Sequence, residues 1–271
     1  MYLTIDIGGT KTLIGLMTKT GKIVNSLKFP TPPDYDEFKH QLAENIAKVT
    51  TTPFTIACSS APARIDHDTG IALAFGNLKW ENVPIRDDIR KITRTPVLLE
   101  NDTKLAGLSE ARLLIPPRNK VLYITISTGI GSVLVVDNKI DPDLRDSEVG
   151  HMVFERKGEL VPWESFASGK AIVKRFGKRA SDIDDPLTWE IISKDIAIGL
   201  IDVIANVQPD IVIFGGGVGS HFKKFKKPLM RELKKYESPL VPIPDIVGAI
   251  NPEEAVIYGC YEMIKDYEKQ L

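Results

Sequence analysis

The chain has 271 residues, of which 43% are hydrophobic and 26% charged, with a formal net charge of -1. This allows a buried core in one large domain or two small ones, and the near-neutral charge gives no support for a nucleic-acid partner. The only two cysteines, Cys58 and Cys260, form neither a disulfide framework nor a zinc motif, and no apolar stretch approaches the ~20 residues of a membrane helix. With no basic secretory region at the start, we expect a cytoplasmic protein with two buried thiols.

Strands and helices alternate along the first part of the chain. Apolar runs predict strands at residues 3–7, 12–18, 22–28, 54–58 and 97–100. Asp36 is placed to cap a helix whose apolar positions continue to Val49, and a further helix is predicted at 105–114. This order is typical of an α/β fold.

Residues 121–140 repeat the pattern of the opening. A strand, a glycine-containing turn, a second strand, a polar turn and the start of a third strand follow in the same order as at residues 2–23. We therefore expect two related lobes, each beginning with a β-hairpin. Beyond the repeat, the pattern predicts helices at 165–179, 187–207 and 252–267 and a buried strand at 211–214.

The first glycine turn follows a strand that contains one acid, Asp6. Backbone N–H groups in such a turn can bind an anion, and Thr10 and Lys11 add a hydroxyl and a cation. Gly8 and Gly9 would let a phosphate approach the backbone, and Asp6 could hold a metal ion directly or through water. The alternative is a plain tight hairpin with Asp6 on a solvated face.

Two further glycine clusters occur, one in the repeated hairpin and one after the strand at 211–214. Neither matches the P-loop, which ends in Gly-Lys-Ser/Thr, nor the dinucleotide fingerprint. A strand that leads into glycines and then a helix is nevertheless a frequent nucleotide site. The candidate residues are Thr128, Gly129, Gly131, Gly215, Gly216 and Gly217.

Acids at the end of the strand at 97–100 offer a catalytic base. Asp102 could accept a proton from an attacking hydroxyl, and Asn101 beside it could bind a sugar. The alternative is that Asp102 caps the following helix.

Other polar side chains suit the binding of a polyol. They are Glu148 and His151 around one glycine, Glu164 in "VPWESFASG", and Asn77, which we expect to lie with Trp80 in a polar loop at "AFGNLKW". Of the four histidines, we expect only His151 to be functional.

Six ordered motifs together resemble one family. "DIGGTK", "ENDTKLAGLSEA", "STGIG", "EVGH", "WESFASGKAI" and "PDIVIFGGGVG" occur in the same order as in the ROK family of repressors, open reading frames and sugar kinases. The resemblance covers nearly the whole chain. It implies two actin-like, ribonuclease H-like α/β lobes with a nucleotide cleft between them, residues 1–112 plus 250–271 forming the first and 113–249 the second.

The resemblance also implies roles for the candidate residues. Asp6 with Gly8, Gly9, Thr10 and Lys11 is similar to the family's first phosphate motif, residues 128–131 to the second, and residues 215–217 to the adenosine motif. Asp102 corresponds to the catalytic base. The residues implied to bind the sugar are Asn77, Asn101, Asp102, Glu148, His151 and Glu164. ATP and Mg²⁺, the latter near Asp6, are the implied cofactors.

One segment departs from the family. Many members carry a cysteine-rich zinc loop between the motifs that resemble "EVGH" and "WESFASG", whereas this chain has "MVFERKGELVP". A Cys₃His site cannot form without cysteines, so we expect no structural zinc. The ring of His151 must then be oriented by something other than a metal.

The resulting hypothesis is an ATP-dependent sugar kinase that phosphorylates a hexose hydroxyl, with O6 of glucose as first choice because "GNLKW" resembles the glucokinase loop. N-acetylhexosamines and other hexoses stay open, as does polyphosphate as donor. The alternative is a sugar-binding or regulatory member with impaired catalysis. A repressor is disfavoured because no DNA-binding segment precedes Asp6. We expect no nucleic-acid or membrane partner, and the resemblance suggests a homodimer.

Overall fold

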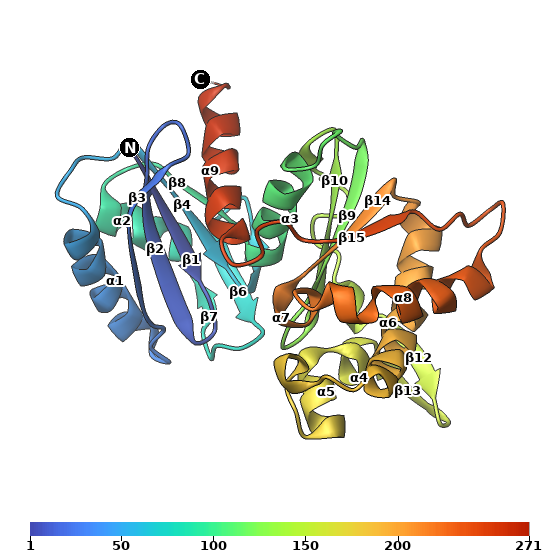
Figure 1. The fold of residues 1–271 in the computed structure, drawn as a ribbon. Coiled ribbons are helices and arrows are strands. Elements are labelled where there is room, and N and C mark those ends of the chain that lie inside the picture. The colour runs from blue at the N-terminus through green and yellow to red at the C-terminus, as the bar shows by residue number, and fades with distance from the viewer. Residues whose placement is uncertain (271) are drawn as a thin grey trace. The chain divides into compact units, whose positions relative to one another are not determined.

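The computed structural model describes residues 1–270 and divides them into two compact units (Figure 1). Unit 1 comprises Met1–Ser109 and the C-terminal segment from Glu253, and unit 2 comprises Glu110–Pro252. Among residues 1–270 we find no helix with the length and hydrophobicity that crossing a membrane requires.

Unit 1 is built on a five-stranded sheet of order β3-β2-β1-β4-β8. Its strands are β1 (Tyr2–Ile7), β2 (Lys11–Met17), β3 (Ile23–Pro30), β4 (Ile56–Ala61) and β8 (Val97–Asn101). The first three are antiparallel neighbours, and β4 and β8 extend the sheet in parallel. The carboxyl ends of β1, β4 and β8 therefore lie at one edge, which is where ligands bind in open α/β sheets.

Helices cover both faces of this sheet. α1 (Tyr35–Val49) and α2 (Ile85–Thr93) lie on one face and α9 (Ala255–Glu268) on the other (Figure 1). The first cap prediction is wrong: Asp34 caps α1 by accepting a hydrogen bond from Glu37 N at 2.9 Å, while Asp36 lies in the first turn. Cys58 and Cys260 are buried free thiols, as predicted.

A three-stranded sheet and one more helix complete unit 1. The strands are β5 (Ala63–Asp66), β6 (Ile71–Phe75) and β7 (Glu81–Val83), and the helix is α3 (Asp102–Arg112), whose last residues belong to unit 2. Trp80, expected in a polar loop, is buried against Tyr35, Phe38 and Phe75. It is a core residue of unit 1.

Unit 2 repeats the sheet of unit 1 in the order β11-β10-β9-β14-β15. Its strands are β9 (Lys120–Ile126), β10 (Ile130–Val136), β11 (Lys139–Ile140), β14 (Ile211–Gly215) and β15 (Asp245–Gly248). Antiparallel and parallel pairs occur at the same places as in unit 1. The repeat predicted from the sequence is therefore confirmed as two sheets of one topology.

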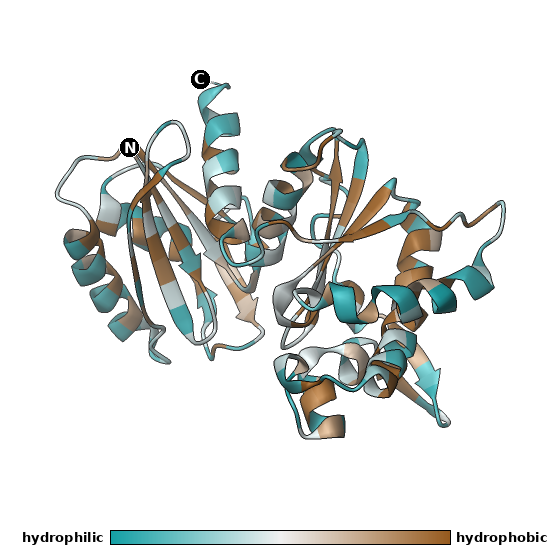
Figure 2. Cartoon of the chain, in the orientation of Figure 1, coloured by the Kyte–Doolittle hydropathy of each residue, from teal (hydrophilic) through white to brown (hydrophobic). Residues whose placement is uncertain are grey.

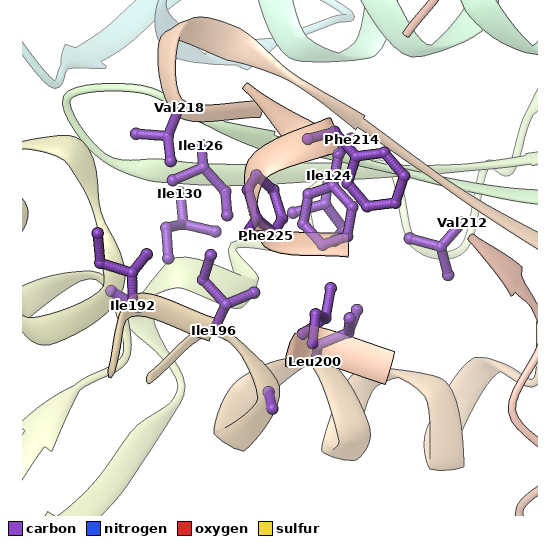
Figure 3. Packing of buried hydrophobic residues seen from close by; sticks show 14 of the residues in the cluster. Ile124, Ile126, Ile130, Ile192, Ile196, Leu200, Val212, Phe214, Val218 and Phe225 are labelled. Carbon is purple, nitrogen blue, oxygen red and sulfur yellow. The ribbon is translucent and has the colours of Figure 1, made fainter. Parts of the chain in front are cut away.

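The long helix α6 (Pro186–Val207) packs on this sheet together with α8 (Phe222–Leu233). Ile192, Ile196 and Leu200 of α6 lie in one buried cluster with isoleucines of the strands, Phe214 of β14 and Phe225 of α8 (Figure 3). Figure 2 shows the same division, with mostly hydrophobic strands and a hydrophilic surface along α8.

Short elements connect the strands of unit 2. They are the 3-10 helix η1 (Val149–His151), the hairpin β12 (Val153–Arg156) and β13 (Glu159–Pro162), α4 (Glu164–Ala167), α5 (Gly169–Phe176), η2 (Ala180–Asp182), α7 (Gly216–Gly219) and η3 (Lys234–Tyr236). The helical pattern predicted at 165–179 is confirmed in α4 and α5, but its continuity is wrong, because the chain breaks at Ser168. Ser168 caps α5 by accepting from Ala171 N at 3.2 Å.

Candidate active site

The first glycine turn joins β1 to β2, and Thr31, which follows β3, stabilises it through hydrogen bonds. Gly8 N donates to Lys11 O at 3.0 Å, which closes the turn. Thr31 Oγ1 donates to Gly8 O at 2.8 Å, and Thr31 N donates to Thr10 O at 3.0 Å. The side chains of Thr10 and Lys11 are left exposed. The turn is thus braced on one side and open to a ligand on the other.

Asp6 lies at the end of β1 and is largely buried, in contrast to the solvated alternative. Ser60 Oγ donates to Asp6 Oδ1 at 2.8 Å and accepts from Ile7 N at 3.0 Å. Burial raises the pKa of Asp6 to about 6; the Ser60 hydrogen bond opposes this shift, and the charge of Asp102 adds to it. Asp6 and Asp102 therefore lie close enough for their charges to interact. A carboxylate oxygen is also the ligand type that Mg²⁺ prefers.

Asp102 is the first residue of α3, directly after β8. Its Oδ1 accepts hydrogen bonds from Thr103 N at 2.7 Å and Thr103 Oγ1 at 3.4 Å. Burial raises its pKa above the usual range for an aspartate, although the hydrogen bonds from Thr103 and the charge of Lys104 oppose the shift. A carboxylate with a raised pKa is a better proton acceptor than an exposed one.

Capping of α3 falls mainly to Asn101. Its Oδ1 accepts from Thr103 N at 2.9 Å and from Lys104 N at 3.4 Å, while its Nδ2 donates to Ala63 O at 3.3 Å. The cap explanation that we considered for Asp102 therefore applies first to its neighbour. The side chain of Asn101 is fixed by these contacts, and its second amide hydrogen is available to a ligand.

Asn77 lies in an exposed loop that touches the first glycine turn. A Cβ atom on Gly9 would lie 2.7 Å from Asn77 Cβ, so only glycine fits at this contact. The loop and the turn are therefore in van der Waals contact within unit 1, and the amide of Asn77 is exposed beside them.

The second glycine turn joins β9 to β10 in unit 2. Ser127 N donates to Gly129 O at 2.9 Å, and the start of α5 closes against the same turn through Gly169 N, which donates to Ser127 O at 2.7 Å. This contact explains the break at Ser168, because the chain must turn there to bring Gly169 onto the turn. The side chain of Thr128 is exposed.

A cavity of about 720 Å³ opens beside this turn. Its size falls in the range of small-molecule sites. The charged side chains along its wall are those of Lys170 and Arg179, both basic, which favours an anionic ligand. The lining residues are Ser127, Thr128, Gly169, Lys170, Val173, Arg179, Ala180, Ser181, Gly217, Val218 and His221.

The glycines of the third cluster have two different roles: two of them allow close packing, and one lines the cavity. Gly216 has φ +77°, and a Cβ atom there would lie 2.5 Å from Thr125 Oγ1 on β9, so this position requires glycine for the fold. A Cβ on Gly215 would likewise overlap the ring of Tyr123. Gly217 has free space around it and lines the cavity. Within this cluster, Gly217 is the residue that can contact a ligand there.

The three predicted sugar-binding residues of unit 2 lie around η1 and α4. Glu148 and His151 are exposed at the two ends of η1, where His151 N donates to Glu148 O at 3.0 Å. Glu164, half-buried, begins α4, and its Oε2 accepts from Ile130 N at 3.2 Å, within the "STGIG" motif of the second glycine turn. A carboxylate predicted to bind sugar is thus bonded to the turn predicted to bind phosphate.

The segment that departs from the family forms the hairpin β12–β13. Arg156 Nη1 lies 2.9 Å from Asp195 Oδ1 on α6, and its guanidinium stacks over Phe166 at 4.2 Å. Arg175 Nη1 donates to the other carboxylate oxygen, Asp195 Oδ2, at 2.7 Å. Trp163 N donates to Met152 O at 2.8 Å, which ties the hairpin base together. These contacts fix the segment that follows His151.

Among residues 1–270, the structure contains no cluster of three or more His, Cys, Asp or Glu side chains that could hold a metal ion. A magnesium ion at Asp6 would therefore take its remaining ligands from water and phosphate oxygens, which is usual for Mg²⁺.

The predicted residues fall into two groups, one in each unit. Unit 1 gathers the first glycine turn, Asp6, Asn77 and the pair Asn101–Asp102, and unit 2 gathers the second turn, Gly217, Glu148, His151 and Glu164. The sequence did not point to Thr31 or Ser60 behind the first turn. The two adjacent serines of β4 were a usable signal, because hydroxyls in a fully buried strand need partners.

His221 was also passed over in the sequence. It lines the cavity of unit 2 together with Lys170, Arg179 and Ser181. These residues come from separate segments, and no pattern in the sequence shows that they share a site.

Comparisons with known proteins extend over both units of the chain. A sequence model of the ROK family matches residues 2–266. A Bacillus subtilis protein provisionally described as a fructokinase is 30% identical over 233 residues, which cover 79% of this chain and 76% of that protein. A glucokinase of Streptomyces coelicolor is 22% identical, with 98% of both chains covered.

Among solved structures, a ROK family glucokinase from Streptomyces griseus in complex with glucose and AMPPNP matches with a TM-score of 0.82. The identity is 22%, and the match covers 96% of this chain and 98% of that chain. This likeness confirms the fold class that the sequence predicts.

Proposed function

The chain belongs to the ROK family, and from this premise we propose that it is an ATP-dependent sugar kinase that transfers a phosphoryl group to a hexose hydroxyl. O6 of glucose is the first-choice acceptor. Relatives named as a glucokinase and, provisionally, as a fructokinase support a hexose as the substrate class.

The observation that carries the proposal is the environment of Asp102. Burial raises its pKa, and both hydrogen bonds from Thr103 reach Oδ1, on one side of the carboxylate. A base for alcohol activation needs this combination of basicity and fixed orientation. In the proposed reaction, Asp102 takes the proton of the sugar hydroxyl, the oxygen attacks the γ-phosphorus of ATP, and ADP leaves.

The nucleotide is assigned to the basic cavity of unit 2. Adenosine would lie against Gly217 and its neighbours, and the glycine turns of both units would bind phosphates through main-chain N–H groups. Lys11 adds a positive charge at the first turn. A magnesium ion near Asp6 would neutralise charge on the phosphate oxygens.

The sugar is assigned to Asn77 and Asn101 of unit 1 and to Glu148, His151 and Glu164 of unit 2. Each offers an exposed or half-buried polar group, and alternating donors and acceptors match the hydroxyls of a hexose. His151 directly precedes the hairpin that Arg156 and Trp163 hold in place, which supports a fixed main chain at His151 without a metal.

The test is a coupled ADP-release assay with Mg-ATP and a panel of sugars: glucose, fructose, allose, N-acetylglucosamine and N-acetylmannosamine. We expect sugar-dependent ADP release, with glucose giving the highest kcat/KM. Replacing ATP by polyphosphate in a parallel series tests the donor. Calorimetric binding of a sugar without ADP release from any member of the panel would instead favour the alternative of a sugar-binding member with impaired catalysis.

A further inference from the structure

Glu164 connects two parts of unit 2 that the proposed function assigns to different ligands. Its Oε2 accepts from Ile130 N at 3.2 Å, within the "STGIG" motif of the second glycine turn. A Cβ atom on Gly129 of this turn would lie 2.5 Å from the same oxygen, and a Cβ on Gly150 of η1 would lie 3.2 Å from it. The carboxylate is thus wedged between the phosphate turn and the helix that carries His151.

The surroundings of this contact are rigid. The side chain of Ile130 is buried in the core cluster beside Ile126 and Ile196 (Figure 3). Trp163, the residue before Glu164, is fully buried, and its Nε1 donates to Asp195 O at 3.1 Å on α6. The main chain on both sides of the contact is thus anchored in the core, which keeps Glu164 beside the turn.

The charge of Glu164 then acts on both ligands. A main-chain N–H of a glycine turn is a donor for an anion, and here a carboxylate already accepts from it. A second negative charge that comes close to this carboxylate is repelled by it. Sugar hydroxyls that donate to the same carboxylate would spread its charge and weaken this repulsion.

We propose that Glu164 makes nucleotide affinity depend on bound sugar. Without sugar, its carboxylate occupies the amide of Ile130 and opposes the approach of phosphates to the second turn. With sugar, its charge is shared with a hydroxyl donor, and the nucleotide binds more tightly. This inference rests on the proposed function, since it takes Glu164 as a sugar ligand and the turn as a phosphate site.

Glu164→Gln tests the inference because it removes the charge and keeps the shape. The amide oxygen of glutamine can still accept from Ile130 N. The measurement is the calorimetric Kd of AMPPNP with Mg²⁺, with and without saturating glucose. In the wild type, glucose should lower the Kd of AMPPNP by about 5- to 150-fold, the usual range of coupling between two ligands.

In Glu164→Gln, AMPPNP should bind several-fold more tightly than to the wild type when glucose is absent, and glucose should add little. A gain in affinity cannot come from a misfolded variant. Glu148→Gln is the matched control: it removes an exposed carboxylate at the other end of η1, so glucose should bind more weakly while sugar-free AMPPNP affinity stays unchanged.

Equal or weaker sugar-free AMPPNP binding by Glu164→Gln would overturn the inference, and so would equal tightening in Glu148→Gln. These outcomes are separate from those of the kinase assay. If the wild type releases ADP with glucose but shows no coupling, the inference fails and the proposed function stands. If tightening is seen while no sugar supports ADP release, the proposed function fails and the charge effect stands.

Discussion

The two glycine turns begin equivalent strands of equivalent sheets, yet opposite kinds of side chain hold them. In unit 1, the neutral hydroxyls of Thr31 and Ser60 brace the turn and the strand before it. In unit 2, a carboxylate, Glu164, and the start of α5 do so. The comparison teaches that the repeat preserves the backbone of the turn while its chemistry is free to diverge.

The charged side chains near the two candidate sites also differ between the units. Unit 1 carries Asp6 and Asp102, both with raised pKa, at the carboxyl ends of the parallel strands β1 and β8, whereas the cavity of unit 2 has basic charges along its wall. Unit 1 is therefore suited to proton transfer and unit 2 to binding an anion. Four tests, which use five substitutions and their controls, examine this division in order of decreasing effect.

Asp102→Asn should have the largest effect. Removing a general base costs about 10²- to 10⁴-fold in kcat, because asparagine keeps the shape of the side chain but cannot take the proton. The affinity for glucose should change by no more than about threefold, which is under 1 kcal/mol. Steady-state kinetics and calorimetry measure the two quantities. Turnover close to that of the wild type would remove Asp102 from its proposed role and break the division between the units.

Asp6→Asn should stabilise unit 1 while lowering activity. The folded state raises the pKa of Asp6 from 3.8 to about 6, so it binds more protons than the unfolded state between these values. The resulting penalty is absent below pH 4 and complete above pH 6. At pH 7.5 the substitution should thus raise the free energy of unfolding by up to about 3 kcal/mol, with each pKa unit worth about 1.4 kcal/mol.

Urea denaturation in EDTA at pH 7.5 and pH 4.5 measures this gain, which should shrink at the lower pH. The control is Asp68→Asn, an exposed aspartate of unit 1. It should change the free energy of unfolding by less than about 0.5 kcal/mol at either pH. A gain for Asp6→Asn that is the same at both pH values would refute the explanation by charge burial.

The sequence predicted the features that depend on neighbouring residues and missed the contacts between residues that are far apart along the chain. Glycine spacing and apolar runs identified both turns, the repeat and the position of Asp102, since each depends on a few consecutive residues. Ser60 meets Asp6 from 54 positions along the chain, and Thr31 reaches Gly8 from 23. No local pattern carries such contacts.

The errors have the same origin. The helix predicted at 165–179 had good periodicity, and its break at Ser168 arises from a contact between Gly169 and Ser127. Trp80 looked like part of a polar loop because its neighbours in sequence are polar, whereas its neighbours in space are aromatic. His221 follows the glycines of α7, and only the fold brings it to the cavity wall.

Arg156→Met and Arg175→Met form a matched pair, because each removes one of the two ion pairs of Asp195. Buried ion pairs cost about 3–5 kcal/mol to break, but both arginines are partly exposed, so we expect a loss of about 2 kcal/mol. Chemical denaturation measures it.

Kinetics should separate the pair. Arg156 holds the hairpin after His151, so its loss should raise the sugar KM several-fold and leave the ATP KM nearly unchanged. Arg175 belongs to α5, which lines the cavity, so its loss should act on the ATP KM. Equal effects of both variants on both constants would mean that Asp195 only stabilises the fold of unit 2.

Thr31→Val should have the smallest effect and is the sharpest test of how the first turn is held. Valine has the shape of threonine but lacks the hydroxyl that donates to Gly8 O and meets Thr12 Oγ1 at 2.9 Å. A buried carbonyl left without its donor costs about 1–3 kcal/mol. A loss in the lower part of this range, if it weakens phosphate binding, lowers kcat/KM for ATP about 10-fold and leaves the sugar KM unchanged.

Thr31→Ser restores the hydroxyl and should recover most of the loss. If Thr31→Val leaves kcat/KM for ATP unchanged, the hydrogen bond to Gly8 O does not hold the turn, and the contrast between a hydroxyl-braced and a carboxylate-braced turn loses its basis.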